Sequence, residues 1–186
     1  MQHNHSFKNL GLLMLVLLAM HVCHAQTSNW QLLGPIAFPV NISGQINGIG
    51  RVCQIKFDPN NANTMYACSA SGGFWKSINS GANWTLLGTD MLPKMGTSSC
   101  CIDHTNSNII YLSSGDPNYY GQDLGLWKTT NGGNTWSQIN NGIGSLMALE
   151  LLMDPNNNQT LLAATNNGIW KTTDGGANWT QKINGI

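Results

Sequence analysis

The stretch GIWKTTDGGANW (168–179) decides the fold, because the chain contains three versions of it. Its close relatives are GFWKSINSGANW (73–84) and GLWKTTNGGNTW (125–136). Each copy is preceded by two strand-like runs joined by an acidic turn and is followed by one short strand-like run. The Trp residues that end the copies lie 52 and 43 residues apart. Four-stranded units that recur about every 40–50 residues are typical of β-propeller blades.

We therefore predict an all-β fold built from β-propeller blades of four antiparallel strands. Alternation supports the strands, because Cys53, Ile55 and Phe57 fall on one face of the first of them. Frequent Gly and Asn residues and short apolar runs argue against a helical repeat. The predicted units are blade 1 at 51–88, blade 2 at 89–140 and blade 3 at 141–186.

A further Trp motif near the N-terminus suggests that the ring is incomplete. NWQLLG (29–34) matches NWTLLG (83–88) at five of six positions. Residues 26–50 are therefore expected to hold an orphan closing strand and a loop. Three blades cannot close a ring, since propellers have about 4–8 blades. The chain is expected to be an N-terminal fragment of a longer multi-blade protein, or else an open piece that assembles with others into a ring.

The turn inside each copy follows the pattern Ser/Thr-x-Asp/Asn-x-Gly-x-x-Trp. The Asp or Asn oxygen can accept hydrogen bonds from turn amides and so close the hairpin. The Gly permits the positive φ that such a turn needs, and the Trp can bury a large ring between neighbouring elements. The pattern residues are Ser77, Asn79, Gly81 and Trp84; Thr129, Asn131, Gly133 and Trp136; and Thr172, Asp174, Gly176 and Trp179.

This turn pattern resembles the Asp-box, or BNR repeat, of sialidase-like and sortilin (VPS10)-like propellers. The order of motifs also resembles the N-terminal blades of large secreted bacterial proteins of the sortilin-like or BNR-repeat glycosyl-hydrolase-like type. Many such proteins carry a C-terminal sorting domain for type IX secretion. The resemblance implies that the twelve pattern residues are structural and lie away from the ligand face. It spans roughly 30–186.

Residues 1–25 are predicted to be a secretory signal peptide that lies outside the fold. Lys8 precedes the apolar run LGLLMLVLLAM (10–20), and CHA (23–25) places small residues before a cleavage site after Ala25. An N-terminal membrane anchor is the alternative. The mature protein is thus expected to be secreted, either extracellular or on a bacterial cell surface.

Charge excludes two classes of partner. Removal of Lys8 leaves seven Lys and Arg residues against eight Asp and Glu residues. A chain so close to neutral offers no basic surface to nucleic acid or to an anionic membrane. We therefore expect no nucleic-acid partner and no membrane insertion.

The cysteines suggest one cross-strand disulfide. If Phe57 faces Thr64 in an antiparallel pair, then Cys53 faces Cys68, and export permits a bridge. The alternative is that both are small buried hydrophobes. The cysteine spacing fits no zinc signature, so no metal site is predicted.

Catalytic motifs are sparse. A sialidase grips a carboxylate with three arginines, whereas this chain has the single Arg51. In xyloglucanase-like glycosidases the segment after the first blade's second strand carries a catalytic Asp, and YACSASGGFW (66–75) resembles it with Ala70 at that position. Glycoside hydrolysis needs two carboxylates. His104 is interpreted as a surface turn residue. We predict no catalytic residue in this chain.

The segment SGDPNYYGQDLG (114–125) is the least repeat-like part of the chain and lies in the expected ligand-side loop of blade 2. Aromatic faces with planar polar groups suit sugars or extended peptides. A decorated surface loop is the alternative. Asp116 and Asp123 could also help to hold Ca²⁺, although no cofactor is required. The candidate ligand-binding residues are Arg51, Asp116, Tyr119, Tyr120, Gln122 and Asp123.

The function that follows is a secreted β-propeller scaffold that binds a carbohydrate or protein ligand without catalysis of its own. The remaining blades of a longer chain are its other expected partner. The alternative is the N-terminal part of a secreted, xyloglucanase-like glycoside hydrolase whose catalytic carboxylates are mostly absent here. A third class resembles the photosystem II assembly propellers, which use a basic patch that this near-neutral chain lacks.

Overall fold

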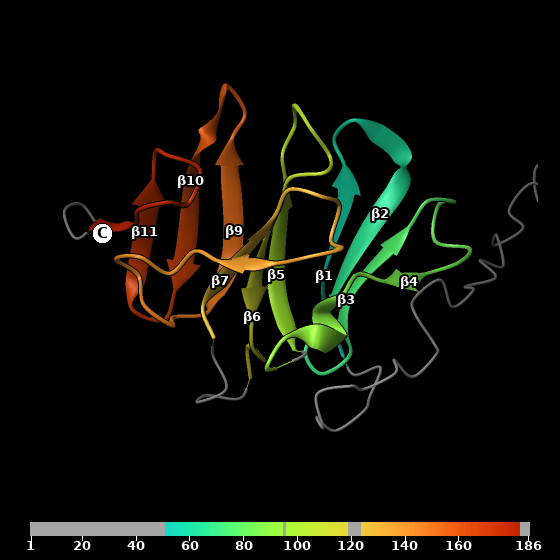
Figure 1. Ribbon diagram of the computed structural model, residues 1–186, viewed down its shortest axis with the longest axis horizontal. Coiled ribbons are helices and arrows are strands. Elements are labelled where there is room, and N and C mark those ends of the chain that lie inside the picture. Colours follow the sequence, from blue (N-terminus) through green and yellow to red (C-terminus); the bar gives the residue numbers. More distant parts are fainter. Residues whose placement is uncertain (1–50, 95, 119–123, 183–186) are drawn as a thin grey trace, which may run out of the picture. The chain divides into compact units, whose positions relative to one another are not determined.

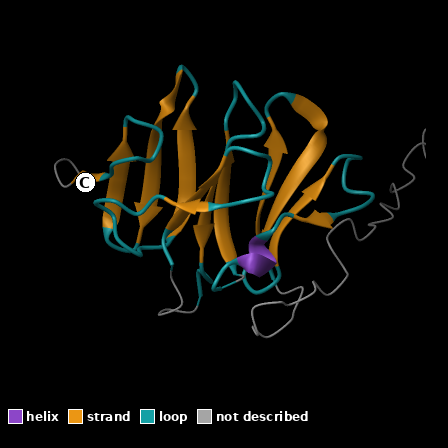
Figure 2. Ribbon diagram, viewed as in Figure 1, coloured by secondary structure: helices purple, strands orange, loops and turns teal. Residues whose placement is uncertain are grey.

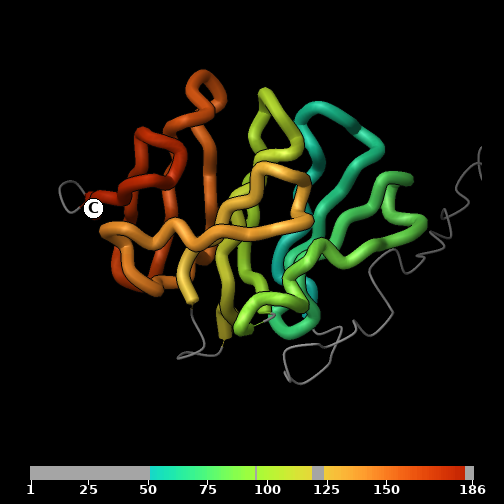
Figure 3. The backbone as a smooth tube through the Cα atoms, in the orientation of Figure 1, coloured from blue at the N-terminus to red at the C-terminus, as the bar shows by residue number. Residues whose placement is uncertain are grey.

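The structure of the protein is a computed structural model that describes residues 51–94, 96–118 and 124–182. The chain divides into two units, Met1–Leu32 and Leu33–Ile186, and every described residue belongs to the second. The predicted signal peptide and closing strand therefore lie outside the described residues. Figure 3 shows the path of the chain through the second unit.

The described residues form three antiparallel sheets of four strands each, which confirms the predicted all-β class (Figures 1 and 2). Within every sheet the strands pair in chain order. One short 3₁₀ helix, η1 (Thr89–Met91), follows the first sheet. The sheets are blade 1, with β1 (Val52–Asp58), β2 (Asn61–Ser69), β3 (Gly73–Ser77) and β4 (Thr85–Leu86); blade 2, with β5 (Thr97–Ile102), β6 (Ile110–Ser114), β7 (Leu126–Thr129) and β8 (Ser137–Gln138); and blade 3, with β9 (Ala148–Asp154), β10 (Asn157–Thr165), β11 (Gly168–Thr172) and β12 (Thr180–Lys182).

The register of β1 against β2 differs from the predicted one. Phe57 lies opposite Met65, not Thr64, and Gln54 lies opposite Cys68, with irregularities on both sides of this stretch. Cys53 falls within the irregularity between Val52 and Gln54 and has no partner in the register. Cys53 and Cys68 are both free thiols, so the predicted Cys53–Cys68 disulfide is wrong in this structure.

An irregularity beside the β1–β2 turn causes the shift in register. The carboxylate of Asp58 accepts a hydrogen bond of 2.9 Å from the backbone N–H of Asn60, which is the bond of an Asx-turn. Asp58 therefore pairs directly with Asn61 across the turn. The turn alone would place Phe57 opposite Ala62, but Phe57 pairs with Met65, so residues 62–64 form the irregularity and β2 lies one position from the predicted register.

Apolar side chains fill the space between neighbouring blades. Tyr66 and Phe74 of blade 1 stack with ring centroids 5.6 Å apart, and Trp136 of blade 2 meets Phe74 edge-on. Each such buried side chain contributes about 1.5–3 kcal/mol. The buried cluster between blades 1 and 2 contains Tyr66, Cys68, Phe74, Cys100, Ile102, Ile110 and Leu112. The cluster between blades 2 and 3 contains Tyr111, Leu126, Ile143, Ala148, Leu151, Leu161, Ala163 and Trp179.

The first strand of each blade lies beside the first strand of the next. β1 contacts β5, and β5 contacts β9 (Figure 1). Hydrogen bonds of Gln54 to the side chains of Ser99 and Glu150 join all three strands. The blades are therefore stacked in the order of the sequence.

The connection between blades 2 and 3 supplies a matched test of this packing. Gly142 and Gly144 both have positive φ, but a Cβ on Gly142 would lie 2.1 Å from the carbonyl oxygen of Trp179, whereas one on Gly144 would meet nothing within 4 Å. We expect Gly144→Ala to lower the free energy of unfolding by about 1–2 kcal/mol, the cost of the left-handed backbone. Gly142→Ala should lower it by a further ~1–3 kcal/mol through the clash. Urea unfolding measures both, and equal losses would contradict this packing.

Candidate ligand-binding site

Three loops meet at one end of blades 1 and 2. The N–H of Ala70 bonds the carbonyl of Arg51 at 2.9 Å, and the N–H of Gly115 bonds the carbonyl of Gly96 at 2.8 Å. Gly96 lies so close to Ala70 that a Cβ there would come 2.2 Å from the Ala70 carbonyl oxygen. Close backbone packing therefore fixes the positions of the loop residues at this end of the blades.

Two predicted ligand-binding residues, Arg51 and Asp116, bind each other at this end. Nη2 of Arg51 lies 2.5 Å from Oδ1 of Asp116, which also accepts a hydrogen bond from the N–H of Asn118. The Arg51 side chain is 49% exposed and that of Asp116 is 27% exposed. The ion pair joins the start of β1 to the enlarged loop of blade 2. The exposed part of the guanidinium keeps donors that a ligand could use.

The other predicted ligand-binding residues lie outside the described residues. They are Tyr119, Tyr120, Gln122 and Asp123. Within the described ranges no group of three or more His, Cys, Asp and Glu residues could hold a metal ion. The alternative in which Asp116 and Asp123 help to hold Ca²⁺ depends on Asp123 and is therefore not tested.

Ala70 occupies the position at which the xyloglucanase-like resemblance implies a catalytic Asp. Its side chain is buried at 7% exposure among the loops described above. A methyl group at this position supplies no acid, base or nucleophile. The nearby Cys53 thiol is no substitute, because burial raises its pKa despite the opposing charge of Arg51. The described residues at this end thus supply one ion pair and closely packed backbone.

The three predicted Asp-box turns lie at the opposite ends of the strands. In each blade the N–H of a residue in this turn bonds a carbonyl near the start of the second strand, as Ser80 does to Asn63 and Gly175 to Gln159. In blade 3 the Thr172 hydroxyl donates to Asp174 at 2.7 Å, and Asp174 accepts the N–H of Asn178 at 2.9 Å.

Blades 1 and 2 repeat this turn geometry with Asn in place of Asp. Asn79 accepts the hydroxyl of Ser77 and the N–H of Asn83, and Asn131 accepts the hydroxyl of Thr129 and the N–H of Thr135. The pattern glycines Gly81, Gly133 and Gly176 have φ values of 89°, 95° and 90°. The amide oxygen therefore makes the same bonds as the carboxylate oxygen.

The pattern Trp residues connect neighbouring blades. The indole N–H of Trp136 donates to the carbonyl of Leu87 at 2.9 Å, and that of Trp179 donates to the carbonyl of Ile139 at 3.0 Å. Trp84 holds the equivalent position in blade 1. The box residues whose contacts are described thus stabilise turns and blade junctions.

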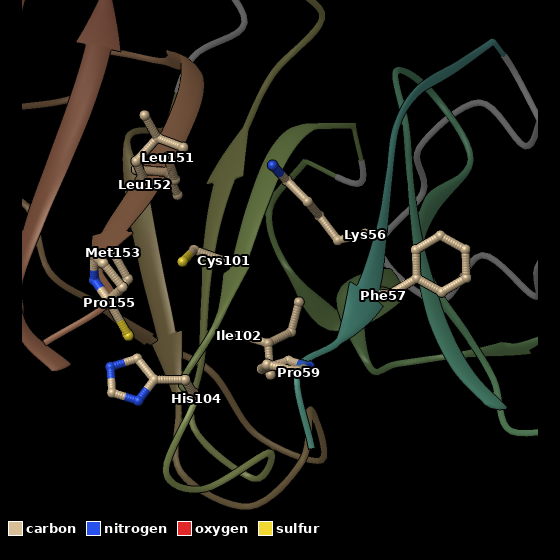
Figure 4. Close-up of a pocket in the computed structure, with 10 residues that line it drawn as sticks. All are labelled: Lys56, Phe57, Pro59, Cys101, Ile102, His104, Leu151, Leu152, Met153 and Pro155. Atoms are coloured by element: carbon tan, nitrogen blue, oxygen red, sulfur yellow. The ribbon is translucent and has the colours of Figure 1, made fainter. Parts of the chain in front are cut away.

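A cavity of about 330 Å³ lies among the first strands of the three blades and the turns that follow them (Figure 4). Its walls include Lys56 from β1, Cys101 from β5 and Leu152 from β9. His104 also lines it, with its Nε2 3.2 Å from the carbonyl oxygen of Asp154. None of the lining residues carries a carboxylate. Burial raises the pKa of Cys101 to about 12, so this thiol is a poor nucleophile.

Comparison with known proteins identifies the fold. No protein-family model matches the chain, and no curated protein matches it. Among solved structures it is similar to an ancestral GH74 enzyme (TM-score 0.58, 23% identity, 73% of this chain and 18% of that one). It is also similar to the GH74 xyloglucanase from Xanthomonas campestris (0.57, 24%, 71% and 20%) and to the GH74 enzyme of Niastella koreensis (0.54, 24%, 70% and 22%). The three sheets are therefore blades of an incomplete β-propeller, as predicted.

The likeness defines the fold alone, because every identity is below 25%. The chain spans about a fifth of the length of these structures, between 18% and 22%. Among the described residues there is no helix long and apolar enough to cross a membrane.

Asp174 should make stability depend on pH. Hydrogen bonds from the Asn178 side chain, the Thr172 hydroxyl and the Asn178 backbone hold its pKa at about 2. Because the folded pKa is depressed, the stabilisation is complete above the ordinary value of about 4 and is lost as the pH falls toward 2. We expect Asp174→Asn to flatten the pH dependence of the urea midpoint in this window.

Asn131→Asp is the reciprocal variant, because it places a carboxylate in the same turn of blade 2. It should make the urea midpoint fall more steeply between about pH 4 and pH 2. Unchanged pH profiles in both variants would show that the turn oxygens do not favour the ionised carboxylate.

Proposed function

We propose that this protein is a secreted Asp-box β-propeller scaffold that binds a carbohydrate or protein ligand and performs no catalysis of its own. The observation that carries the proposal is the Arg51–Asp116 ion pair. It anchors the enlarged loop of blade 2 at the end of the strands away from the box turns. A loop enlarged in one blade alone and fixed at its base is the kind of feature on which a propeller presents a binding site.

The chemistry of this loop favours a sugar or an extended peptide. Arg51 keeps half of its side chain exposed, and the sequence places Tyr119, Tyr120 and Gln122 shortly after Asp116. Aromatic rings can cover the apolar face of a sugar or a peptide, while guanidinium and amide groups bind its polar rim. An acidic sugar or a carboxylate side chain would in addition compete with Asp116 for Arg51.

Three further features agree with a binding scaffold. Ala70 supplies no carboxyl group where the xyloglucanase-like resemblance implies a catalytic Asp. The N-terminal 25 residues carry the features of a signal peptide, which supports secretion. The Asp-box resemblance, including the sortilin-like order of motifs, supports an extracellular protein of several blades. Further blades of a longer chain are then part of the complete scaffold.

A second candidate is part of a glycoside hydrolase. The similar solved structures are GH74 enzymes, one of them a xyloglucanase. A hydrolase needs two carboxylates about 5–10 Å apart, and these would have to come from blades outside this chain. The chain alone would then bind a β-glucan and release no sugar from it.

Ligand binding tests the proposal. We expect the purified chain to bind at least one member of a panel of neutral and acidic oligosaccharides and short acidic peptides, measured by isothermal titration calorimetry. Arg51→Gln should weaken that binding about ten-fold or more, because a charge-assisted bond is lost. Lys171→Gln removes a cation from β11 of blade 3, outside this loop, and is the matched control that should leave the affinity unchanged.

Two results would contradict the proposal. One is the absence of binding across the panel, or binding that Arg51→Gln and Lys171→Gln alter equally. The other is release of reducing sugars from xyloglucan by the purified chain, which would show that the chain itself is catalytic.

A further inference from the structure

Neighbouring blades are joined by three kinds of hydrogen bond that recur at both junctions. We call the face of a blade that contacts the following blade its forward face, and the face that contacts the preceding blade its rear face. The forward face of blade 1 carries Gln54 and Tyr66, and the rear face of blade 2 carries Cys100 and Ile110. The same two surfaces recur between blades 2 and 3.

The first bond lies on the inner strands. The side-chain oxygen of Gln54 accepts the backbone N–H of Cys100 at 2.8 Å. One blade later, the hydroxyl oxygen of Ser99 accepts the backbone N–H of Leu151 at 2.9 Å. Gln54 and Ser99 hold equivalent positions, four residues before the acidic residue of the turn that ends the strand.

The second bond lies between these turns. Asp58 accepts the hydroxyl of Ser107 at 2.7 Å, and Asp103 accepts the side-chain N–H of Asn158 at 3.0 Å. Both donors stand four residues after the turn Asp of their own blade. The third bond is the one from the box Trp to the last strand of the preceding blade. At each of these bonds the forward face accepts and the rear face donates.

On the forward face of blade 3, Asp154 presents the same acceptor without a cover among the described residues, whereas Glu150 already bonds Gln54 and Lys56 of blade 1. Asp154 ends β9 as Asp58 ends β1, and in the described part of the chain its carboxylate accepts only the N–H of Asn156 in its own turn. Beside it, Leu152 is 52% exposed and Leu162 is 38% exposed. Leu162 stands where blades 1 and 2 have the fully buried Tyr66 and Tyr111.

Blade 1 lacks the donor that this face would need. Four residues after Asp58 the chain has Ala62, at the position of Ser107 and Asn158. A second copy that docked its blade 1 onto blade 3 would therefore cover Asp154 with a methyl group. Burying a carboxylate without its hydrogen-bond partner is costly, so this face disfavours head-to-tail closure by copies of the chain.

We propose that the forward face of blade 3, formed by Leu152, Asp154 and Leu162, is the docking surface for a fourth sheet of the same repeat that follows blade 3 in chain order. The sheet carries Ser, Thr or Asn four residues after its turn Asp and a Trp at the end of its box. Its turn donor bonds Asp154, and its apolar rear face covers Leu152 and Leu162. The inference deepens the proposed scaffold function, because it defines the blade that the scaffold accepts.

The test adds such a sheet to the intact chain. The sequence INGI (183–186) repeats most of INNGI (139–143), which begins the connection from blade 2 to blade 3. A copy of 144–182 is therefore joined after Ile186. This copy carries its own Asn158 and Trp179. The readouts are urea unfolding of the whole chain and fluorescence of an apolar dye such as ANS, which reports the exposed face.

We expect the added sheet to raise the urea midpoint of the blade 3 region and to lower dye fluorescence several-fold. Asp154→Ala and the copy's Asn158→Ala should each lower the folding equilibrium constant of the extended chain about ten-fold, and the double variant should lower it no further. In the original chain Asp154→Ala should have little effect, which makes it the matched control. The proposal would be overturned if the losses of stability in the two single variants added up in the double variant, or if the added sheet left dye fluorescence unchanged.

A measurement of self-association distinguishes docking of a fourth sheet from docking of a second copy of the chain. In sedimentation velocity, we expect the original chain to show no self-association that depends on Asp154. The Ala62→Ser variant should self-associate through Asp154. Head-to-tail association of the original chain that Asp154→Ala abolishes would overturn the proposal in favour of a second copy. None of these readouts uses a ligand, so their failure is distinct from a failure of the binding test at Arg51.

Discussion

Face-to-face packing between sheets is the constraint on which the structure depends. Each blade is a small sheet with apolar side chains on both faces, and stacked sheets bury such faces at a spacing of about 10 Å. Tyr66, Phe74 and Ile110 are each fully buried in the junction between blades 1 and 2. Hydrogen bonds from one blade to the next then fix the order and the direction of stacking. The position of every loop follows from that order.

The two ends of the stacked strands differ in their hydrogen bonds and packing. At one end, the Ser/Thr-x-Asp/Asn-x-Gly turn of each blade hydrogen-bonds the backbone near the start of that blade's second strand. At the other end, the loops are held by close backbone packing around Gly96 and by the Arg51–Asp116 ion pair, not by the apolar contacts between blades. Variation at the second end would therefore change the proposed binding surface while the stack remains intact. This separation agrees with a scaffold whose loops carry the function.

The sequence predicts the fold well because the repeat is local. Twelve residues that occur three times define the turns, and the strand pairing follows from the turns. The register of β1 and β2 was predicted wrongly, because irregularities fall beside the Asx-turn at Asp58 and at Cys53. The pairing of Arg51 with Asp116 spans 65 positions, and no local pattern encodes such a contact. The sequence alone aligns Ala62 with Ser107 and Asn158. Only the contacts between blades show that Ser107 and Asn158 donate hydrogen bonds to the preceding blade.

Native-state hydrogen exchange of the backbone amides of Cys100 and Leu151 tests the stacking most directly. Each amide donates to a side chain of the preceding blade, Cys100 to Gln54 and Leu151 to Ser99. Both should exchange slowly in the unaltered protein. Gln54→Ala should accelerate exchange at Cys100 and spare Leu151, and Ser99→Ala should do the reverse. If neither variant changed the exchange rate of its own amide more than that of the other amide, the stacking described for these blades would be contradicted.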